Sequence, residues 1–302
     1  MPPGDERDVA PTAVTPKAPE RGPSVIDLLR LSRTRGFSPG DQALYRQIAK
    51  LTGLSEAEEL GSMVDVPCGR GLVAQFFAEN YGIEVAGVDP DPATVEAAEE
   101  RARTAEISTQ IQFQKAPAHD LPFQDSVFDM AVGELGIASS EDPLSAVKEL
   151  ARVTRPGGVV VLIALIWTGH VDEERRRILI QHLGASPLLL VEWKQALREA
   201  AVVDLKLEDW SDQAFPFVVR GRTFTRWSEF STLADKLAIL VRAWRRWGWR
   251  GLKGALSREY EIRNLLGSER TIGVTLIFGR VASAPAPNTA EGRSAGEAGD
   301  IR

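Results

Sequence analysis

The chain has 302 residues, of which 43% are hydrophobic and 26% charged, and its formal net charge is −6. This composition is typical of a soluble globular protein, with enough chain for one large α/β domain or two small domains. The single cysteine, Cys68, excludes a disulfide framework and a cysteine-based zinc site. The longest apolar run, Val159–Trp167, is too short to span a bilayer, and Met1–Ser24 lacks the apolar core of a secretory signal. We therefore expect a soluble, cytoplasmic protein.

Both ends of the chain are predicted to be disordered tails. Residues 1–23 are rich in Pro, residues 283–302 are rich in Ala, Pro, Gly, Ser and Glu, and both have few bulky apolar residues. Such segments cannot bury enough surface to offset the entropy lost on ordering. The rest, 24–282, is predicted to form one domain. Its expected parts are N-terminal helices within 24–60, a core at 61–210, a helical cap at 211–270 and a last strand at 271–282.

Helical and strand-like segments alternate along the core. The expected helices are Val25–Arg35 and Gly40–Leu51, then Leu72–Tyr81 and two that open at Asp91-Pro92 and Asp142-Pro143, where Asp is the N-cap and Pro the first residue. The expected strands are Met63–Val66, Ile83–Asp89, Ile111–Ala116, Phe128–Val132 and Val159–Ile166. These strands are continuously apolar, which is typical of a parallel sheet covered on both faces. The pattern predicts a doubly wound, Rossmann-like α/β fold.

The pattern changes after the fifth strand. Glu192–Ala201 is an expected helix, and Val202–Leu207 and Thr271–Val281 are expected to complete a mostly parallel seven-stranded sheet. The roughly sixty residues between those strands are too many for a simple connection. Within them, Leu233–Trp247 is predicted to be an amphipathic helix. Its expected apolar face consists of Leu233, Leu237, Leu240, Val241 and Trp244. We expect this insertion to cap the carboxyl edge of the sheet, where open α/β sheets bind ligands.

A glycine-rich turn follows the first core strand. In the segment from Met63 to Gly71 (MVDVPCGRG), the two glycines allow close approach of a ligand to the backbone, and the next helix offers free N–H groups. Asp89 ends the next strand, where it can accept hydrogen bonds from two ribose hydroxyls. Gly69–Ala74 also fits the dinucleotide pattern G-x-G-x-x-A, and a turn serving only chain reversal is the simpler alternative. The acidic Asp65 favours a ligand with a cationic amino group.

Four segments in the right order resemble class I S-adenosylmethionine-dependent methyltransferases, specifically the small-molecule group that includes the ubiquinone/menaquinone methyltransferases. They are Val64–Gly71, Gly87–Asp91, Leu121–Asp129 (LPFQDSVFD) and Glu149–Gly158 (ELARVTRPGG). The resemblance covers roughly residues 40–210, with a weaker similarity extending to residue 281. It implies S-adenosyl-L-methionine as the cofactor and methyl transfer as the activity.

The resemblance also implies roles for individual residues. Those expected to bind the cofactor are Asp65, Pro67, Gly69, Gly71, Asp89, Pro90, Ala118, His119 and Glu134. Among them, Asp65 and the turn would hold the methionine part, Asp89 the ribose, and Pro90, Ala118 and His119 the adenine. This sequence departs from the family pattern twice. Pro67 replaces the first glycine, and Pro117 replaces the acidic partner of the adenine amino group, for which His119 or Asp120 is a substitute.

Candidate catalytic residues lie after the fourth and fifth strands. Methyl transfer requires a positioned acceptor and, for some acceptors, a base. Glu134 is the first candidate, although it can equally bind the amino group of the cofactor. His170 is the second, and its alternative is a solvated loop residue. Tyr45 either lines the cofactor or packs in the core, and Cys68 is expected to fill space beside the turn. We expect no metal.

Tryptophan and arginine are concentrated in one segment near the C-terminus. Lys236–Arg258 contains seven basic residues and no acidic ones, together with Trp244, Trp247 and Trp249. The rest of the chain therefore carries −13, which disfavours a nucleic-acid partner. Two interpretations remain: a cap helix with its aromatic face on the sheet edge, or a contact with a membrane surface. The first predicts a small, apolar or aromatic acceptor.

Two alternatives to a methyltransferase are kept. A nicotinamide-dependent oxidoreductase is favoured by the G-x-G-x-x-A match, but no hydride-transfer group is evident after the fourth or fifth strand. A non-catalytic cofactor-binding protein of the same fold is favoured by the prolines at positions 67 and 117.

Overall fold

The computed structural model describes residues 22–29, 31, 42–54, 61–211, 233–266 and 271–283. Nearly all of both predicted tails lies outside these residues, as does 212–232 of the predicted cap.

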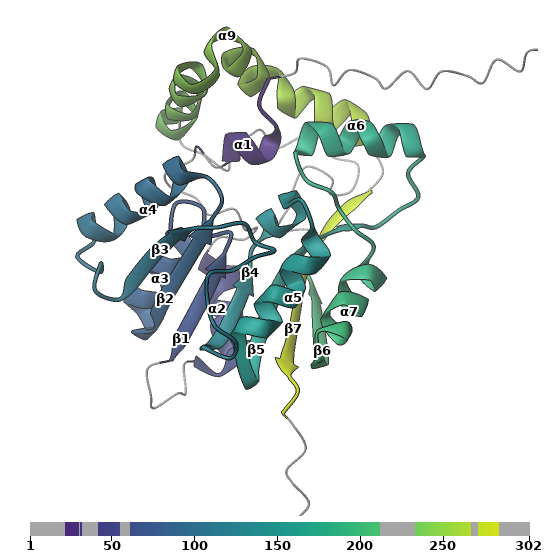
Figure 1. Cartoon of the computed structure of the whole chain (residues 1–302). Helices are drawn as coiled ribbons and strands as arrows, with labels where there is room; N and C mark the ends of the chain where they lie inside the picture. The colour runs from purple at the N-terminus through teal and green to yellow at the C-terminus, as the bar shows by residue number, and fades with distance from the viewer. Residues whose placement is uncertain are drawn as a thin grey trace, which may run out of the picture.

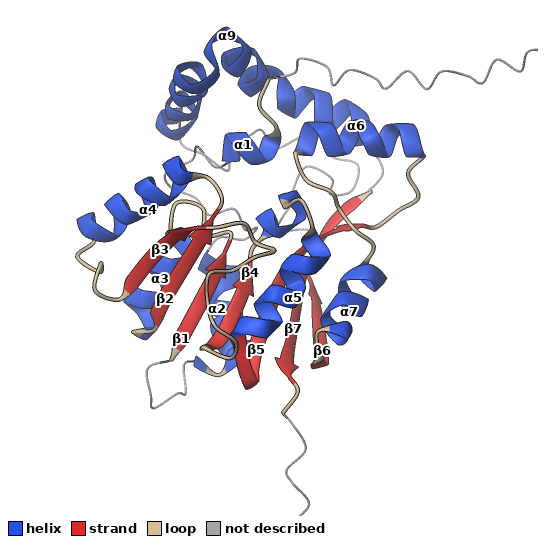
Figure 2. Cartoon of the chain, in the orientation of Figure 1, coloured by secondary structure: helices blue, strands red, loops and turns tan. Residues whose placement is uncertain are grey.

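Seven strands form one sheet in the order β3-β2-β1-β4-β5-β7-β6 (Figures 1 and 2). The strands are β1 Ser62–Val66, β2 Glu84–Asp89, β3 Ile111–Lys115, β4 Phe128–Gly133, β5 Thr154–Trp167, β6 Val202–Asp209 and β7 Ile272–Val281. The pairings among β1 to β5 are parallel, and β7 runs antiparallel to both of its neighbours. The mostly parallel, seven-stranded sheet predicted from the sequence is confirmed.

Helices cover both faces of the sheet. They are α1 Val25–Leu29, α2 Gln42–Thr52, α3 Leu72–Tyr81, α4 Pro92–Thr104, the short 3-10 helix η2 Leu135–Ser139, α5 Pro143–Val153, α6 Glu173–Leu183, α7 Leu190–Glu199 and α9 Leu233–Leu266. Strand order runs from β1 to β2 in one direction and from β4 to β5 in the other. Right-handed crossovers therefore place α3 and α5 on opposite faces. On their respective faces, α2 packs on α3 and α7 packs on α5.

The two Asp-Pro helix starts form as the sequence predicts. Asp91 caps α4 by accepting a hydrogen bond from the N–H of Ala93, and Asp142 caps α5 by accepting one from the N–H of Ser145. Proline follows each cap at the first helical position, where its missing N–H costs no intrahelical bond. Both helices therefore begin at the carboxyl edge of the strand before them.

The core lies between the sheet and its helices. Trp193 of α7 is fully buried and donates its indole N–H to the carbonyl oxygen of Leu165 at 3.1 Å. Tyr45 of α2 is also buried, with its ring centroid 5.5 Å from that of Phe76 and 6.2 Å from that of Phe77. Of the two roles considered for Tyr45, the structure therefore supports core packing.

The cap has a small apolar cluster of its own. Leu28 and Leu31, from α1 and the residues after it, pack against Ile239 and Ala243 of α9. These helices lie above the carboxyl edge of the sheet, with α6 beside them (Figure 1). The helix predicted to end at Trp247 continues to Leu266 through a kink at Gly248, where φ is 62°. Helix α6 was not predicted.

The predicted apolar face of the cap helix is wrong. Leu237, Val241 and Trp244 are 63%, 41% and 51% exposed. Helix α9 has apolar residues on two sides, and the side that is buried is the one that meets α1. Among the described helices, none has both the length and the hydrophobicity that a membrane crossing requires.

Candidate active site

Three buried carboxylates meet at the carboxyl edge of the sheet. Asp65 lies near the end of β1, Asp89 ends β2, and Glu134 directly follows β4, and all three side chains are almost completely inaccessible to solvent. Strand β1 lies between the other two strands, so their ends are neighbours. This is the edge that open α/β sheets use for ligands. The topology thus brings together the three acidic residues that the sequence predicted for cofactor binding.

The glycine turn after β1 packs closely against its surroundings. Gly69 and Gly71 have φ of 53° and 73°, a region that glycine adopts without steric cost. A Cβ on Gly71 would lie 2.7 Å from Cζ of Phe113, whereas a Cβ on Gly69 would meet no atom within 4 Å. Gly71 is therefore required by packing, while Gly69 leaves open space beside the backbone, as close approach of a ligand requires.

Asp89 is oriented by backbone N–H groups from both sides of the site. One carboxylate oxygen accepts a hydrogen bond from the N–H of Gly69 at 3.2 Å, and the other accepts one from the N–H of Asp91 at 2.9 Å. The carboxylate thereby joins the glycine turn to the N-terminus of α4. These contacts fix the position of the side chain expected to bind ribose.

Asp65 is buried, and no positively charged side chain among the described residues donates a hydrogen bond to it. Neither of its carboxylate oxygens forms a hydrogen bond with any of the described residues. Burial raises the pKa of Asp65 well above its usual range, and the nearby carboxylates of Glu134 and Asp89 raise it further, while the N–H of Ala74 acts in the opposite direction. An unpaired buried carboxylate is costly to the free protein and suits a cationic ligand group. The amino group of S-adenosylmethionine fits this requirement.

Pro67 links the turn to the segment after β4. A Cβ on Gly136 would lie 2.5 Å from Cγ of Pro67, so the proline ring packs directly on that glycine. The N–H of Glu134 also donates to the carbonyl oxygen of Val66 at 2.6 Å. The replacement of the family's first glycine by proline is thus matched by a glycine in η2. Nothing in the sequence pattern predicted this role of Gly136.

Cys68 fills the space between the turn and β2. A Cβ on Gly87 would lie 2.9 Å from Cβ of Cys68, and the N–H of Cys68 donates to the carbonyl oxygen of Val88 at 2.8 Å. Burial raises the pKa of the thiol well above its usual range, and the carboxylates of Asp65 and Asp89 raise it further. A thiol held neutral is a poor nucleophile. These contacts favour the predicted packing role.

The remaining predicted residues differ in exposure. Ala118 is buried after β3, and the neighbouring His119 has a buried Nδ1 with no hydrogen-bond partner among the described residues. Pro90 and Asp120 are exposed. His170 is also exposed, in the segment that follows β5.

One contact from the cap was not predicted. Arg246 of α9 donates to a carboxylate oxygen of Asp91 at 2.9 Å, and Asp91 in turn donates its N–H to Asp89. Burial would raise the pKa of Asp91, but hydrogen bonds from Arg246 and Thr94 outweigh this effect and lower it. Helical periodicity can place Asp91 at a cap, but it cannot pair it with a residue so distant in the sequence.

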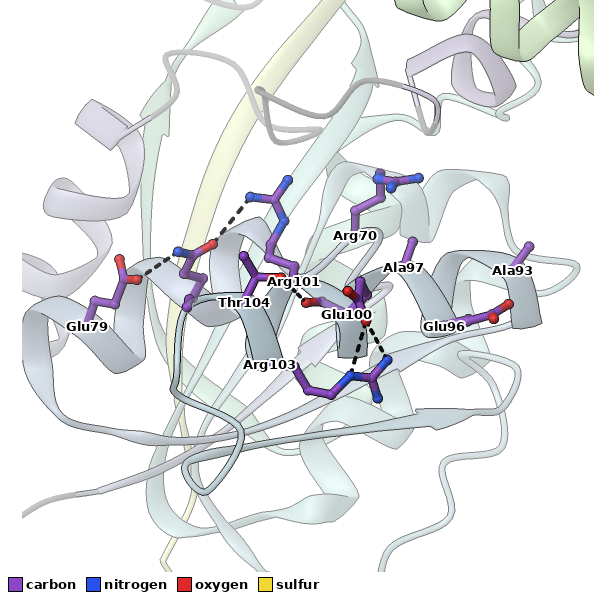
Figure 3. Close-up of a pocket in the computed structure, with 11 residues that line it drawn as sticks. Arg70, Glu79, Ala93, Glu96, Ala97, Glu100, Arg101, Arg103 and Thr104 are labelled. Carbon is purple, nitrogen blue, oxygen red and sulfur yellow. Dashed lines mark hydrogen bonds and ion pairs between the residues drawn. The ribbon is translucent and has the colours of Figure 1, made fainter.

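An open groove of about 990 Å³ lies outside this site, between α3 and α4 (Figure 3). Four of its charged residues bind one another or a shared glutamine. Arg103 contacts Glu100 at 2.8 Å, and Gln75 joins Arg101 to Glu79 through hydrogen bonds of 3.3 and 2.7 Å. The three buried carboxylates lie at the edge where open α/β sheets bind ligands, so we place the functional site there and not in this groove.

Comparison with known proteins agrees with this geometry. Residues 64–162, which include Asp65, Asp89 and Glu134, match the family model of a methyltransferase domain. Tocopherol O-methyltransferase from Arabidopsis thaliana is 26% identical over 237 residues, covering 70% of this chain and 61% of the relative. Norajmaline N-methyltransferase from Rauvolfia serpentina is 26% identical over 190 residues, covering 58% and 64%. The chain thus spans about three fifths of the length of these curated relatives.

A solved structure shares the fold. Phosphoethanolamine N-methyltransferase 2 from Haemonchus contortus, in complex with S-adenosylhomocysteine, matches with a TM-score of 0.63 and 16% identity. The match covers 84% of this chain and 56% of that one.

The fold is Rossmann-like, and residues 64–162 within it match a methyltransferase domain. The chain is thus similar to methyltransferases that act on small molecules, in agreement with the resemblance found in its sequence motifs. The comparisons give no support to a nicotinamide-dependent oxidoreductase.

Proposed function

We propose that this protein transfers a methyl group from S-adenosylmethionine to a small, apolar or aromatic acceptor. The observation that carries the proposal is the buried Asp65 carboxylate, which has no partner among the described residues and lies in the predicted methionine-binding position. The acidic site around it suits a ligand with a positive charge better than it suits a pyrophosphate. This preference separates a sulfonium cofactor from a nicotinamide dinucleotide.

In this proposal the protein binds and positions, and the cofactor supplies a methyl group already activated by its sulfonium charge. Asp65 accepts hydrogen bonds from the cationic amino group, and Asp89 accepts them from the ribose hydroxyls. The open side of Gly69 lets the ligand approach the backbone. Correct placement of the acceptor then supplies most of the rate enhancement.

We propose His119 as the partner of the adenine amino group. That group is a hydrogen-bond donor and needs an acceptor, which Pro117 cannot supply through its side chain. The neutral imidazole has one acceptor nitrogen, and Nδ1 of His119 is buried without a partner among the described residues. Of the two substitutes considered, the exposed Asp120 is therefore the weaker.

For proton removal we propose Glu134 first and His170 second. Glu134 is buried beside Asp65, where it can either remove a proton from the molecule to be methylated or bind the amino group of the cofactor. His170 is exposed after β5 and reaches the site only if the acceptor extends that far. A pH–rate profile of each single variant separates these roles, because loss of a base removes a limb of the profile.

The acceptor class has support at the end of β5. Trp167 lies at the carboxyl edge of the sheet and is buried, and the guanidinium of Arg176 stacks over its ring at 5.2 Å from the centroid. We propose a small molecule as the partner and no nucleic acid. A membrane contact by Lys236–Arg258, the segment rich in tryptophan and arginine, is independent of the proposed methyl acceptor.

Calorimetry with S-adenosylhomocysteine tests the cofactor site. Asp89→Ala should abolish binding, because it removes the ribose acceptor and releases the turn from α4. Glu96→Gln, which removes a carboxylate from the groove of Figure 3, is the matched control and should bind like the wild type. Wild-type affinity in Asp89→Ala would overturn the assignment of the site.

Activity needs a separate test. A thermal shift with S-adenosylhomocysteine but not with NAD would exclude the oxidoreductase alternative. Methylation of any member of a panel of hydroxylated and amine-bearing aromatic compounds would support the proposal. Tight cofactor binding without turnover on the whole panel would instead favour the non-catalytic alternative.

A further inference from the structure

A stripe of apolar side chains is exposed along the first half of α9. Leu237, Val241 and Trp244 are 63%, 41% and 51% exposed. Their spacing of four and three residues places them on one side of the helix. Exposed large apolar residues are unremarkable when they are scattered, but a continuous row marks a contact surface.

This stripe faces away from the rest of the protein. The opposite side of α9 packs Ile239 and Ala243 against α1. On that same side, Arg242 donates to the carbonyl oxygen of Leu31, and Arg246 binds Asp91. At about 100° per residue, these four positions lie across the helix axis from the stripe. The stripe therefore cannot line an acceptor site between the cap and the sheet, and Figure 1 shows α9 at the outer end of the molecule.

A second row follows the kink at Gly248. Trp249 and Leu256 are 78% and 65% exposed, and the exposed Lys253 shares their side of the helix. Among the described residues, eleven large hydrophobic side chains are exposed, and five of them are on α9. The concentration of these side chains on one helix separates them from ordinary surface scatter.

The charge of α9 is opposite to that of the remaining chain. Lys236–Arg258 carries seven basic residues and no acidic one, whereas the rest of the chain carries −13. Arg245 and Lys253 are exposed beside the two apolar rows. A helix with tryptophan and leucine beside arginine and lysine is the pattern of a segment that lies in the headgroup region of a membrane.

We propose that the outer side of α9, formed by Leu237, Val241, Trp244, Trp249 and Leu256 with Arg245 and Lys253, binds the surface of an anionic lipid bilayer. The apolar side chains enter the headgroup region and the two basic side chains contact lipid phosphates. A second copy of the chain fits less well, because two such faces would bring like charges together. A nucleic acid fits less well, because a polyanion gains nothing from exposed leucine and valine.

Vesicle co-sedimentation of the full chain tests the proposal. Wild type should bind vesicles made of equal parts phosphatidylglycerol and phosphatidylcholine, and should bind pure phosphatidylcholine much more weakly. The variant Arg245→Gln/Lys253→Gln should lose about 25-fold in affinity for the anionic vesicles, since each basic residue contributes about fivefold. Raising the salt concentration should have a similar effect.

The apolar contribution has its own variant. Trp244→Gln/Trp249→Gln should lose about tenfold or more, because both rings leave the bilayer interface. The matched control is Val191→Gln, which replaces a 64% exposed apolar residue on α7 and should leave binding unchanged. The side chains changed in these variants are all exposed, so the variants should fold and retain wild-type affinity for S-adenosylhomocysteine. That affinity reports separately on the proposed function.

Three results would overturn the proposal. One is absence of wild-type binding to anionic vesicles. Another is equal binding to both vesicle types with no effect of the charge variant. The third is a concentration-dependent dimer in light scattering that the tryptophan variant abolishes, which would make a second copy the partner.

Discussion

The unpaired Asp65 makes a prediction about stability that opposes its role in binding. In the free protein its carboxylate is fully buried without a hydrogen bond from the described residues, and Glu134 and Asp89 are close enough to raise its pKa. Replacing it by asparagine keeps the shape and removes the charge. We therefore expect Asp65→Asn to stabilise the cofactor-free protein while it weakens cofactor binding.

The sign follows from proton linkage. The folded-state pKa of Asp65 is raised above the value of 3.8 expected in the unfolded chain. Above that pH the unfolded state holds fewer protons than the folded state, so the contribution of Asp65 to the free energy of unfolding falls as pH rises. The stabilisation by Asp65→Asn should therefore be largest near neutral pH and should shrink as pH approaches about 4.

The magnitude follows from the additional cost of an unpaired buried charge over an unpaired neutral amide, about 1–3 kcal/mol. For a chain of this size, that corresponds to a rise in Tm of roughly 2–12 °C. With S-adenosylhomocysteine at about a hundred times its Kd, wild type should gain about 2.7 kcal/mol, and the variant should gain much less. The difference in stability between the two proteins should therefore shrink or change sign when the ligand is added.

Thermal unfolding followed by circular dichroism, at about pH 4.5 and about pH 7.5 with and without the ligand, measures each of these effects. Asp204→Asn is the control, because Asp204 is exposed and its φ of 54° is one that asparagine tolerates. A cofactor-free Asp65→Asn that is less stable than wild type at neutral pH would refute the reasoning.

Three further predictions concern the turn, the cap and the acid–base candidates. Gly71→Ala should lower the free energy of unfolding more than Gly69→Ala does in urea titrations, since both incur about 1–2 kcal/mol of backbone cost but only the first collides with Phe113. Arg246→Gln should cost at most about 1 kcal/mol of stability, yet weaken S-adenosylhomocysteine binding at low salt and not at high salt. Glu134→Gln should reduce methyl transfer by about a hundredfold or more if it is the base, while a histidine-to-alanine change at position 170 leaves kcat unchanged. Equal loss in both variants would contradict this order.

The sequence was sufficient to predict the sheet and the acidic site because both depend on local signals. Each Asp-Pro start fixes a helix through its own cap, and each continuous apolar run fixes a buried strand. Once the strands are parallel, residues at their carboxyl ends must meet at one edge. Asp65, Asp89 and Glu134 could thus be brought together without any knowledge of their contacts.

The cap could not be predicted in the same way, because its burial depends on a partner distant in the sequence. Helix α9 has apolar residues on two sides, and periodicity alone does not indicate which side is buried. Leu28 and Leu31 decide between them by packing on Ile239 and Ala243. For the same reason the sequence did not predict the contact between Arg246 and Asp91, which joins the cap to the proposed cofactor site.

The buried acidic site and the basic cap together suggest why the charge is distributed so unevenly. Asp89 is held by the backbone N–H groups of Gly69 and Asp91, whereas Asp65 has no hydrogen bond from the described residues. Arg246 is the contact through which the cap reaches this acidic edge, and it binds Asp91 rather than Asp65. Had an arginine of the cap paired with Asp65, it would have occupied the position that the cationic amino group of the cofactor requires. Under the proposed function, the separation of the two charges keeps Asp65 available for the amino group of the cofactor and leaves the outer side of α9 basic.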